Sequence, residues 1–470
     1  MENSILHLAE FVHDTTFDDL PESVVTFTKN HLLDTFGCGI AGVTSDKGKW
    51  GIDFGRRCFS GRPEATVLGY GDRLSAMGAV FVNAELINGL DYEAAGLHVP
   101  PYVLPPTLAL AEQKEKRGKE FITASAVALE VGTRVAHGLI HPEAIAEDGK
   151  EAGIAPVFGP CSTVFGGAAG AAKMSDFDKE KTAHAMGLAG VLSPVPSQAS
   201  MHRDLPVNSG KYLMAGWGAQ AGLTAAELIR SGHRGNLHVL DSEFGYWRFT
   251  GQGGWDAKKA LDGLGEKWEF LQSTPYKQFP CCGMMHGGLE CLTAVIEEND
   301  LRPGEIESIC AYLDPSSAEG MFHPKELENQ IDAQFSVAYN MSLVAFGMKP
   351  GIRWQDPGMI HNPEIQEFMK RVTSRVHPEC AAAQAKDRRA RVVSVTVKAR
   401  GQIFEKELRF IKGTVMAGSL MEVTDEMRLE KFRENTSLIL PDYRREEAIR
   451  VLQALDEAES MREVVDLLHV

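Results

Sequence analysis

The chain has 470 residues, of which 44% are hydrophobic and 24% charged, a balance typical of folded globular proteins, and its length predicts about two or three domains. Its 64 acidic residues outnumber the 48 basic residues, and the resulting net charge of −16 opposes binding to nucleic-acid phosphates or anionic lipid. No apolar stretch reaches the length of a membrane span, so the sequence predicts neither a nucleic-acid nor a membrane partner.

The N-terminal segment MENSILHLAEFVHDTTF has neither the basic and apolar runs of a secretory signal nor the composition of a transit peptide, and it predicts the first helix of a cytoplasmic protein. The eight cysteines form no CxxC pair, and none has a histidine at metal-ligand spacing, so we expect neither a disulfide framework nor a zinc module. We expect most of these thiols to be reduced and buried.

Apolar residues recur every three or four positions through several N-terminal segments, which is the spacing of a helix with one buried face. The predicted helices span residues 22–43, 73–90, 105–118 and 118–139. Three segments rich in Ala and Gly follow between residues 166 and 228. Because small side chains let helix backbones approach closely, these segments predict a tightly packed helical core.

The strongest strand patterns lie in residues 306–313 and 391–410, with a predicted helix over 331–347 between them. In the second of these segments valines alternate with polar residues, and Arg400-Gly401 stands where a hairpin turn is needed. The pattern returns to helix over 423–435, where Thr424 is the expected N-cap.

This order predicts a mainly α protein. We expect an all-helical domain made of residues 1–268 and 411–470, interrupted by a smaller α/β (α+β) lid domain over residues 269–410.

Polar residues interrupt an otherwise buried helical pattern in the segment NGLDYEAAGLHVPPYVLPP (88–106). Asp91, Glu93 and His98 stand there just before two pairs of prolines. A helix cap and an ordinary loop histidine explain these residues as well as a functional site does, so the pattern by itself leaves both interpretations open.

Three further places combine polar groups with small or apolar neighbours. Cys161 and Ser162 precede a small-residue helix, whose first amides suit either a carboxylate ligand or a simple cap. Lys211 enters an Ala/Gly-rich helix, where its ammonium must reach solvent or meet an anion. Lys277 and His286 flank Cys282, which we interpret as a packing residue at a buried turn. No complete dinucleotide fingerprint, P-loop, HExxH motif or nucleophile elbow is present.

In combination these segments resemble the MmgE/PrpD family, which includes 2-methylcitrate dehydratase, cis-aconitate decarboxylase and iminodisuccinate epimerase. The resemblance runs from about residue 20 to 435 and rests on seven motifs in register: HLLDTFGCGIAG, NGLDYEAAGLHVPPYVLPPTLALAE, ALEVGTRVAHGL, STVFGGAAGAAKM, SGKYLMAGWGAQAGLTAAEL, YKQFPCCGMMHGGLECL and DAQFSVAYNMSLVAFG. It implies a large helical domain built from both ends of the chain, a smaller lid, a homodimer, and chemistry on small di- or tricarboxylates without metal or other cofactor.

Carried over residue by residue, the resemblance places Asp91, His98 and Lys211 in catalytic roles. The remaining candidates would bind substrate: Lys277, Ser162, Cys161, Tyr92, Cys282 and His286. Removal of a proton next to a carboxylate builds up negative charge, which clustered lysines in a dry cleft stabilise better than water does. His98, tuned by Asp91, is the expected base, and the prolines that follow are expected to fix the loop that carries both residues.

The sequence departs from the family pattern at two places. Gly159 stands where the family commonly has a histidine, and Glu93-Ala94-Ala95 stands where it has Asp-Asp-Thr. Because lost polar contacts change which substrate is accepted, the general proton chemistry is a firmer expectation than any named substrate. We expect a lyase close to 2-methylcitrate dehydratase, with an epimerase or a decarboxylase as enzymatic alternatives and a non-catalytic carboxylate-binding protein as the alternative of another class.

Overall fold

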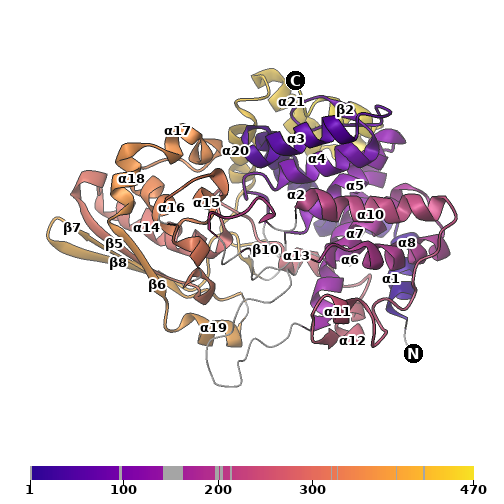
Figure 1. Ribbon diagram of the computed structural model, residues 1–470, viewed down its shortest axis with the longest axis horizontal. Coiled ribbons are helices and arrows are strands. Elements are labelled where there is room, and N and C mark those ends of the chain that lie inside the picture. The colour runs from indigo at the N-terminus through magenta and orange to yellow at the C-terminus, as the bar shows by residue number, and fades with distance from the viewer. Residues whose placement is uncertain are drawn as a thin grey trace.

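In the computed structural model, residues 3–94, 98–140, 162–195, 201, 205–211, 214–318, 320–324, 326–387, 389–416 and 419–470 are described. Helices dominate these residues and the sheets are small, so the predicted class, mainly α with an α+β part, is confirmed. Figure 1 shows the two kinds of structure side by side, with both chain termini on the helical side.

The helical part contains the long helices of the N-terminal half, three short helices that follow them and the C-terminal helices. They are α1 (Ser4–Asp14), α2 (Glu22–Ala41), α3 (Asp46–Cys58), α4 (Ala76–Ile87), α5 (Pro100–Gln113), α6 (Gly118–Gly138), α7 (Val164–Met174), α8 (Lys179–Leu192), α10 (Ala215–Arg230), α11 (Tyr246–Phe249), α12 (Ala257–Leu261), α13 (Phe270–Ser273), α20 (Asp425–Thr436), α21 (Asp442–Gln453) and α22 (Met461–Asp466). The short strand pairs β1 (Ala65–Thr66) with β2 (Arg73–Leu74), and β3 (Leu139–Ile140) with β4 (Gly254–Trp255), lie among them.

The α+β part is built on a four-stranded sheet of order β6-β5-β7-β8. Its strands are β5 (Ile306–Leu313), β6 (Val372–Val376), β7 (Val393–Ala399) and β8 (Gln402–Leu408), and its helices are α14 (His286–Asn299), α15 (Gln330–Phe335), α16 (Val337–Ala345), α17 (Pro357–Ile360), α18 (Pro363–Met369) and α19 (Cys380–Lys386). Strands β5 and β6 are parallel and the other neighbours antiparallel. Helix α14 packs on this sheet, and the small pair β9 (Val415–Met416) and β10 (Ser419–Leu420) follows it in the chain.

Most predicted elements are confirmed. The strand predicted over 306–313 is β5, and the predicted hairpin is β7 and β8. Its turn residues Arg400 and Gly401 have φ of 52° and 69°, the left-handed backbone that a two-residue hairpin turn needs. The helix predicted over 331–347 is instead two helices, because Ser336 ends α15 and caps α16 through its side chain.

The four prolines of the segment 88–106 are helix residues and not loop residues, which corrects the expectation that they fix the loop of Asp91 and His98. All four lie in helix α5, which begins at Pro100 instead of residue 105. Pro100 and Pro101 occupy the first turn, where the missing N–H has no helical partner in any case. The loop of Asp91 is therefore bounded by two helices, α4 before it and α5 after it.

The two ends of the chain pack directly against each other. Helix α20 lies on α2, and α22 lies on α5. The amide of Gly118, at the start of α6, donates to the carbonyl of Ala458 at 2.8 Å, and the amide of Met461 donates to the carbonyl of Lys116 at 2.8 Å. No helix in the described part of the chain is both long and apolar enough to cross a bilayer.

The contact at Gly118 yields a prediction about stability. A Cβ atom at this position would lie 1.6 Å from the carbonyl oxygen of Leu455, so Gly118→Ala must push the C-terminal segment away from α6. We expect a loss of about 1–3 kcal/mol of unfolding free energy, measured by denaturant unfolding. Gly304→Ala is the control, because a Cβ there meets nothing within 4 Å. Equal stability of the two variants would contradict the described packing.

Candidate active site

The candidate site starts at the turn that follows α4. Asp91 has φ of 53°, and its amide donates to the carbonyl of Asn88 at 3.2 Å, so the chain reverses sharply as it leaves the helix. Aspartate is one of the few residues that adopts this left-handed conformation without a large penalty. The turn buries the side chains of both Asp91 and Glu93 completely.

Two buried lysines from distant parts of the chain meet Asp91. The Lys277 ammonium donates to the Asp91 carboxylate at 2.7 Å and to its backbone carbonyl at 2.8 Å. Lys211, which lies just before α10, brings its ammonium to 3.7 Å from the same carboxylate oxygen. The structure thus brings together three of the residues that the sequence pointed to, although they are up to 186 positions apart.

The charges of this cluster shift one another's pKa. Burial alone would raise the pKa of Asp91, but the ammonium groups of Lys211 and Lys277 outweigh burial and hold the pKa well below its usual range. Burial lowers the pKa of Lys211 to about 8, although Asp91 opposes this effect. Burial would also lower the pKa of Lys277, but Asp91 and Glu93 reverse the direction and raise it. Of these two lysines, Lys211 is therefore the one that exchanges its proton closer to neutral pH.

His98 forms its close contact with Glu93. Its ring Nδ1 lies 2.8 Å from Glu93 Oε1 and 3.9 Å from the Asp91 carboxylate. Asn88 donates to the same Glu93 oxygen at 2.6 Å, which fixes the carboxylate. Burial would raise the pKa of Glu93, but the hydrogen bond to His98 and the charges around it lower the pKa. Glu93, which we did not assign to the site from sequence, therefore orients the imidazole in the place expected for Asp91.

Each of the two acids keeps one carboxylate oxygen without a partner. Asp91 Oδ2 and Glu93 Oε2 are buried and accept no hydrogen bond. A buried carboxylate oxygen without a donor is costly. The two atoms therefore mark positions where a hydrogen-bond donor of a ligand would be favourable.

Three further polar residues, which were not assigned to the site from sequence, form hydrogen bonds with the cluster or with the backbone next to it. Lys47, on α3, donates to the Asn88 side chain at 2.6 Å. The Gln334 carbonyl oxygen accepts from the Lys211 ammonium, and its amide donates to the carbonyl of Gly89 at 2.9 Å. Gln355 donates to the carbonyl of Leu90 at 2.7 Å. Gln334 lies inside the quoted motif DAQFSVAYNMSLVAFG, whereas Lys47 and Gln355 had no signal in the sequence.

The other candidates from sequence that the structure describes are buried, and two of them form hydrogen bonds outside the Asp91 cluster. Tyr92 is buried, and its hydroxyl donates to the carbonyl of Gln278 at 3.0 Å, so it points away from Asp91. Cys282 is buried, and its amide donates to the carbonyl of Gln334 at 3.0 Å. Ser162 is buried in the turn before α7. Cys161, and the departures Gly159 and Ala95, fall outside the described residues.

His286 is buried against the ring of Phe279, and its Nε2 lies 3.2 Å from the carbonyl of Cys281. Burial, together with the charge of Lys277, lowers the pKa of His286 to about 3. The ring is therefore neutral at physiological pH and serves as packing or as a neutral contact.

Asp91, Glu93 and His98 also form the one cluster among the described residues with the composition of a metal site, since one ligand atom of each lies within 4.8 Å of the others. The ammonium groups of Lys277 and Lys211 already stand at 2.7 and 3.7 Å from Asp91. A divalent cation beside them would meet strong repulsion, so we assign no metal to the cluster.

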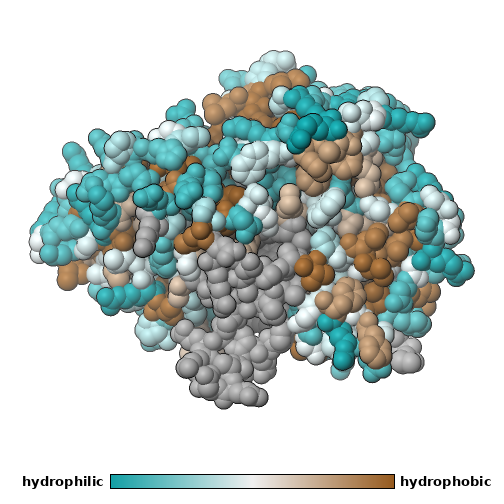
Figure 2. Space-filling model, viewed as in Figure 1, coloured by the Kyte–Doolittle hydropathy of each residue, from teal (hydrophilic) through white to brown (hydrophobic). Residues whose placement is uncertain are grey.

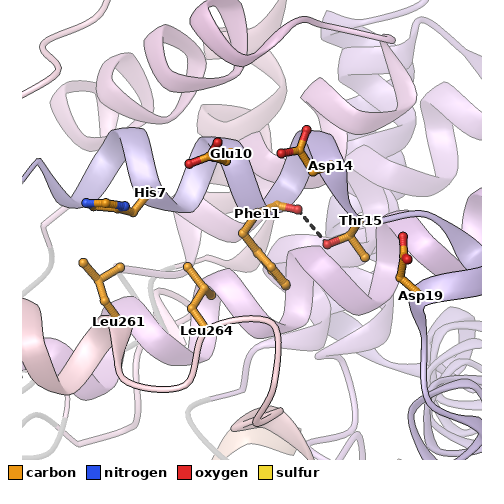
Figure 3. Close-up of a pocket in the computed structure, with 8 residues that line it drawn as sticks. All are labelled: His7, Glu10, Phe11, Asp14, Thr15, Asp19, Leu261 and Leu264. Atoms are coloured by element: carbon orange, nitrogen blue, oxygen red, sulfur yellow. Dashed lines mark hydrogen bonds between the residues drawn. The ribbon is translucent and has the colours of Figure 1, made fainter.

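A separate groove of about 580 Å³ lies on the surface along α1 (Figure 3). Glu10, Asp14 and Asp19 line it together with Leu261 and Leu264. Thr15 donates to the carbonyl of Phe11 at 2.7 Å there, which is an ordinary helix-end contact. Its carboxylates would repel an anionic ligand, and this groove is not a candidate for carboxylate binding.

Two family models match most of the chain. The model of the MmgE/PrpD N-terminal domain matches residues 6–257, and the model of the MmgE/PrpD C-terminal domain matches residues 279–457. The chain belongs to the MmgE/PrpD family.

Two curated relatives are similar to parts of the chain. The cis-aconitate decarboxylase-like protein oryM of Aspergillus oryzae is 26% identical over 313 residues, which cover 62% of this chain and 61% of that protein. Human cis-aconitate decarboxylase is 28% identical over 281 residues, which cover 58% of this chain and 55% of that protein. The matched region thus spans somewhat more than half of the length of each relative.

The pKa of Lys211 gives a prediction with a defined sign. Its pKa is about 8 in the folded protein against 10.5 for an unperturbed lysine, so between these values the unfolded chain binds more protons and the folded state gains stability as the pH rises. We expect wild-type protein to gain stability relative to Lys211→Met as the pH is raised from 8 to 10.5. Parallel thermal unfolding of both proteins measures this difference, and a difference that does not change with pH would show that the Lys211 pKa is not lowered.

Proposed function

We propose that the chain is an enzyme that moves a proton at a carbon next to a carboxylate of a small di- or tricarboxylate. The observation that carries the proposal is the buried pairing of Glu93 with His98 at 2.8 Å, placed beside Asp91 and its two lysines. The His98 side chain is 13% exposed, whereas the two acids are fully buried. A histidine held by a carboxylate is a suitable general base near neutral pH.

The lysines supply the second requirement of this chemistry. Loss of a proton beside a carboxylate leaves an enediolate with two negative charges, and its formation needs positive charge that is already in place. Lys211 and Lys277 are buried within 4 Å of Asp91, where their charges act more strongly than at the surface. Lys211, with a pKa of about 8, is also suited to return a proton.

Among the reactions that share this step, we propose dehydration of a hydroxy acid, as in 2-methylcitrate dehydratase. His98 removes the proton from carbon, the C–H electrons form the double bond, and the hydroxyl takes up a proton from the Lys211 ammonium and leaves as water. The unpartnered oxygens of Asp91 and Glu93 support a substrate with a hydroxyl or amine donor. An epimerase of the iminodisuccinate type, which needs only removal and return of the proton, fits the same two atoms.

Decarboxylation is the second candidate, because one relative is named cis-aconitate decarboxylase and the other a cis-aconitate decarboxylase-like protein. In that reaction the departure of CO2 leaves the carbanion, which His98 or Lys211 would then protonate. The lysines serve this reaction equally well. The two unpartnered carboxylate oxygens of Asp91 and Glu93 favour dehydration over decarboxylation, because cis-aconitate carries no hydroxyl or amine that could donate to them.

Proton NMR in deuterium oxide with citrate, 2-methylcitrate, cis-aconitate and iminodisuccinate separates these reactions. New alkene signals from a hydroxy acid indicate dehydration, exchange without net product indicates epimerisation, and loss of a carboxyl carbon as CO2 indicates decarboxylation. Thermal stabilisation by one of these acids without any turnover would instead support a non-catalytic carboxylate-binding protein and would overturn the proposed activity.

Substitution of Glu93 tests its role in catalysis. Glu93→Gln keeps the shape of the side chain but removes the charge that holds His98, and we expect kcat/KM to fall about 10²-fold or more. The control is Glu112→Gln, since Glu112 is equally buried and accepts from Thr66 away from the site. A Glu93→Gln enzyme with the rate of wild type would rule out the proposed pairing.

We also propose the domain division expected from sequence, with residues 269–410 as a lid inserted into a helical domain, although α13 at the start of this range packs against α6 of the helical part. The pattern of contacts supports it, because α2 packs against α20 and α21, whereas α14 and α16 pack against the sheet of the other part. The cluster draws Asp91 and Lys211 from the helical part and Lys277 and Gln334 from the proposed lid. A relative movement of the two parts would therefore open or close the site.

We further propose a homodimer that uses the apolar surface of α8 and α10. Val191 and Trp217 on these helices are 57% and 53% exposed, and Figure 2 shows hydrophobic residues gathered over this side of the helical part. Exposed apolar patches on a soluble protein commonly mark an interface.

Substitution within this patch tests the dimer. Trp217→Glu places a charge in the proposed interface, and we expect light scattering after gel filtration to change from a dimer to a monomer. Ile403→Glu is the control, because Ile403 is 67% exposed on β8, far from α10 in the fold. A wild-type protein that is monomeric at all concentrations would refute the proposal.

A further inference from the structure

A buried ion pair contacts the turn formed by residues 91–94, which carries Asp91 and Glu93 and is here called the acid turn. Lys431 on α20 and Asp34 on α2 are both buried, and their charged groups are 2.6 Å apart. The two residues are almost 400 positions apart in the chain, and neither belongs to the group of candidates found from sequence. Burial alone would lower the pKa of Lys431, but Asp34 reverses this and raises it, so the ammonium stays charged.

The Lys431 ammonium is joined to both halves of the candidate site. It donates to the backbone carbonyl of Tyr92 at 2.8 Å and to the backbone carbonyl of Lys277 at 3.0 Å. Tyr92 is the residue between Asp91 and Glu93. One ammonium therefore holds the acid turn at its centre and, at the same time, the backbone of the lysine that neutralises Asp91.

Asp34 completes the arrangement from the other side. Its second carboxylate oxygen accepts from the amide of Ala94 at 3.1 Å. The pair thus binds the acid turn at two points, the carbonyl of Tyr92 and the amide of Ala94, on either side of Glu93. The side chain of Glu93, and with it His98, depends on this backbone for its position.

The Lys431 ammonium is enclosed by groups of the protein itself. It donates hydrogen bonds to the carbonyls of Tyr92 and Lys277, and the Asp34 carboxylate neutralises its charge at 2.6 Å. The rings of Tyr92 and Tyr276 cover the group, with their centroids 4.0 and 4.5 Å from the nitrogen. Its effect on any reaction must therefore pass through the groups that it holds.

We propose that Asp34 and Lys431 are positioning residues, which fix the acid turn and Lys277 relative to each other so that the Glu93–His98 pair and the Asp91–Lys277 pair face the same substrate. The expected effect on rate rests on the proposed function. The expected effect on the position of the acid turn and Lys277 does not. Displacement of a catalytic group by about 1 Å can lower the rate about 10²-fold, so a pair that sets this distance matters for catalysis without touching the substrate.

A second buried ion pair provides a matched control. Arg134 and Glu130 on α6 are fully buried and 2.5 Å apart, and Arg134 also donates to backbone carbonyls, those of Ala260 at 2.8 Å and Lys267 at 2.7 Å. The two pairs are thus alike in burial and in the kind of contact. They differ in what they hold, since Arg134 fixes the segment between α12 and α13, and none of the candidate residues that the structure describes is among its hydrogen-bond or ion-pair partners.

Amide hydrogen exchange, followed by mass spectrometry, tests without any substrate whether the pair holds the acid turn and the Lys277 segment in place. In Lys431→Met we expect faster exchange in residues 90–94 and 276–280, whereas in Arg134→Met we expect it in residues 260–270. Asp34→Asn should act on residues 90–94 as Lys431→Met does. If Lys431→Met leaves both site segments as protected as in wild type, or speeds exchange over the whole chain, the positioning role is wrong.

Enzyme kinetics test the expected effect of the pair on the reaction rate, once the NMR screen has identified a substrate. We expect Lys431→Met to lower kcat/KM about 10- to 100-fold, Lys431→Arg to restore much of that loss, and Arg134→Met to keep kcat/KM per folded molecule within about twofold. If Lys431→Met and Arg134→Met lose stability alike and both keep the wild-type rate, the pair is structural only. A wild-type enzyme without turnover on the acids tested overturns the proposed function, and hydrogen exchange still decides the positioning role.

Discussion

The candidate site depends on the neutralisation of the Asp91 carboxylate inside the protein. A carboxylate that is removed from water is stable only when opposite charge and hydrogen bonds replace its hydration. Lys277 provides both at 2.7 Å, and Lys211 adds a second positive charge at 3.7 Å. This requirement draws together α4, α10 and the segment after α13, so the same interaction that makes the burial of Asp91 possible also joins the helical and α+β parts.

Charge balance around the site explains how so many ionisable groups share one interior. Each of the buried lysines Lys47, Lys277 and Lys431 has a carboxylate within 4 Å. An anionic substrate would add negative charge to this paired set. Lys211 also has a carboxylate within 4 Å, that of Asp91 at 3.7 Å, but burial lowers its pKa to about 8. Perturbation of this kind is common where a group must take up and release a proton. Within the described part of the chain, Lys211 and the unpartnered oxygens of Asp91 and Glu93 are therefore the groups most ready to change partner when a ligand arrives.

Much of the fold was predictable from sequence, because it depends on local patterns. Helical spacing located α2 and α6, and the alternating valines with Arg400-Gly401 located the β7–β8 hairpin. The prolines of α5 were misjudged, since their place in the first turns of a helix depends on where the preceding loop ends. Lys47, Gln355 and Lys431 carried no local signal at all.

The same distinction holds for the site. Asp91, Lys211 and Lys277 stood out through motifs, whereas the choice between Asp91 and Glu93 as the partner of His98 required coordinates. The two acids are two positions apart in the sequence, but the left-handed backbone at Asp91 turns its side chain toward the lysines and leaves Glu93 with the histidine. Contacts that join distant segments, such as Asp34 with Lys431, follow from packing and not from any pattern along the chain.

A crystal structure of the protein with bound citrate would show where a tricarboxylate lies relative to Asp91, Glu93 and His98. We expect a carboxylate of citrate within about 3 Å of the Lys211 or Lys277 ammonium, a hydroxyl that donates to Asp91 Oδ2 or Glu93 Oε2, and a CH2 group next to the His98 ring. Citrate bound outside this cluster, or bound within it with both carboxylate oxygens still unpartnered and no carbon near His98, would contradict the proposed site.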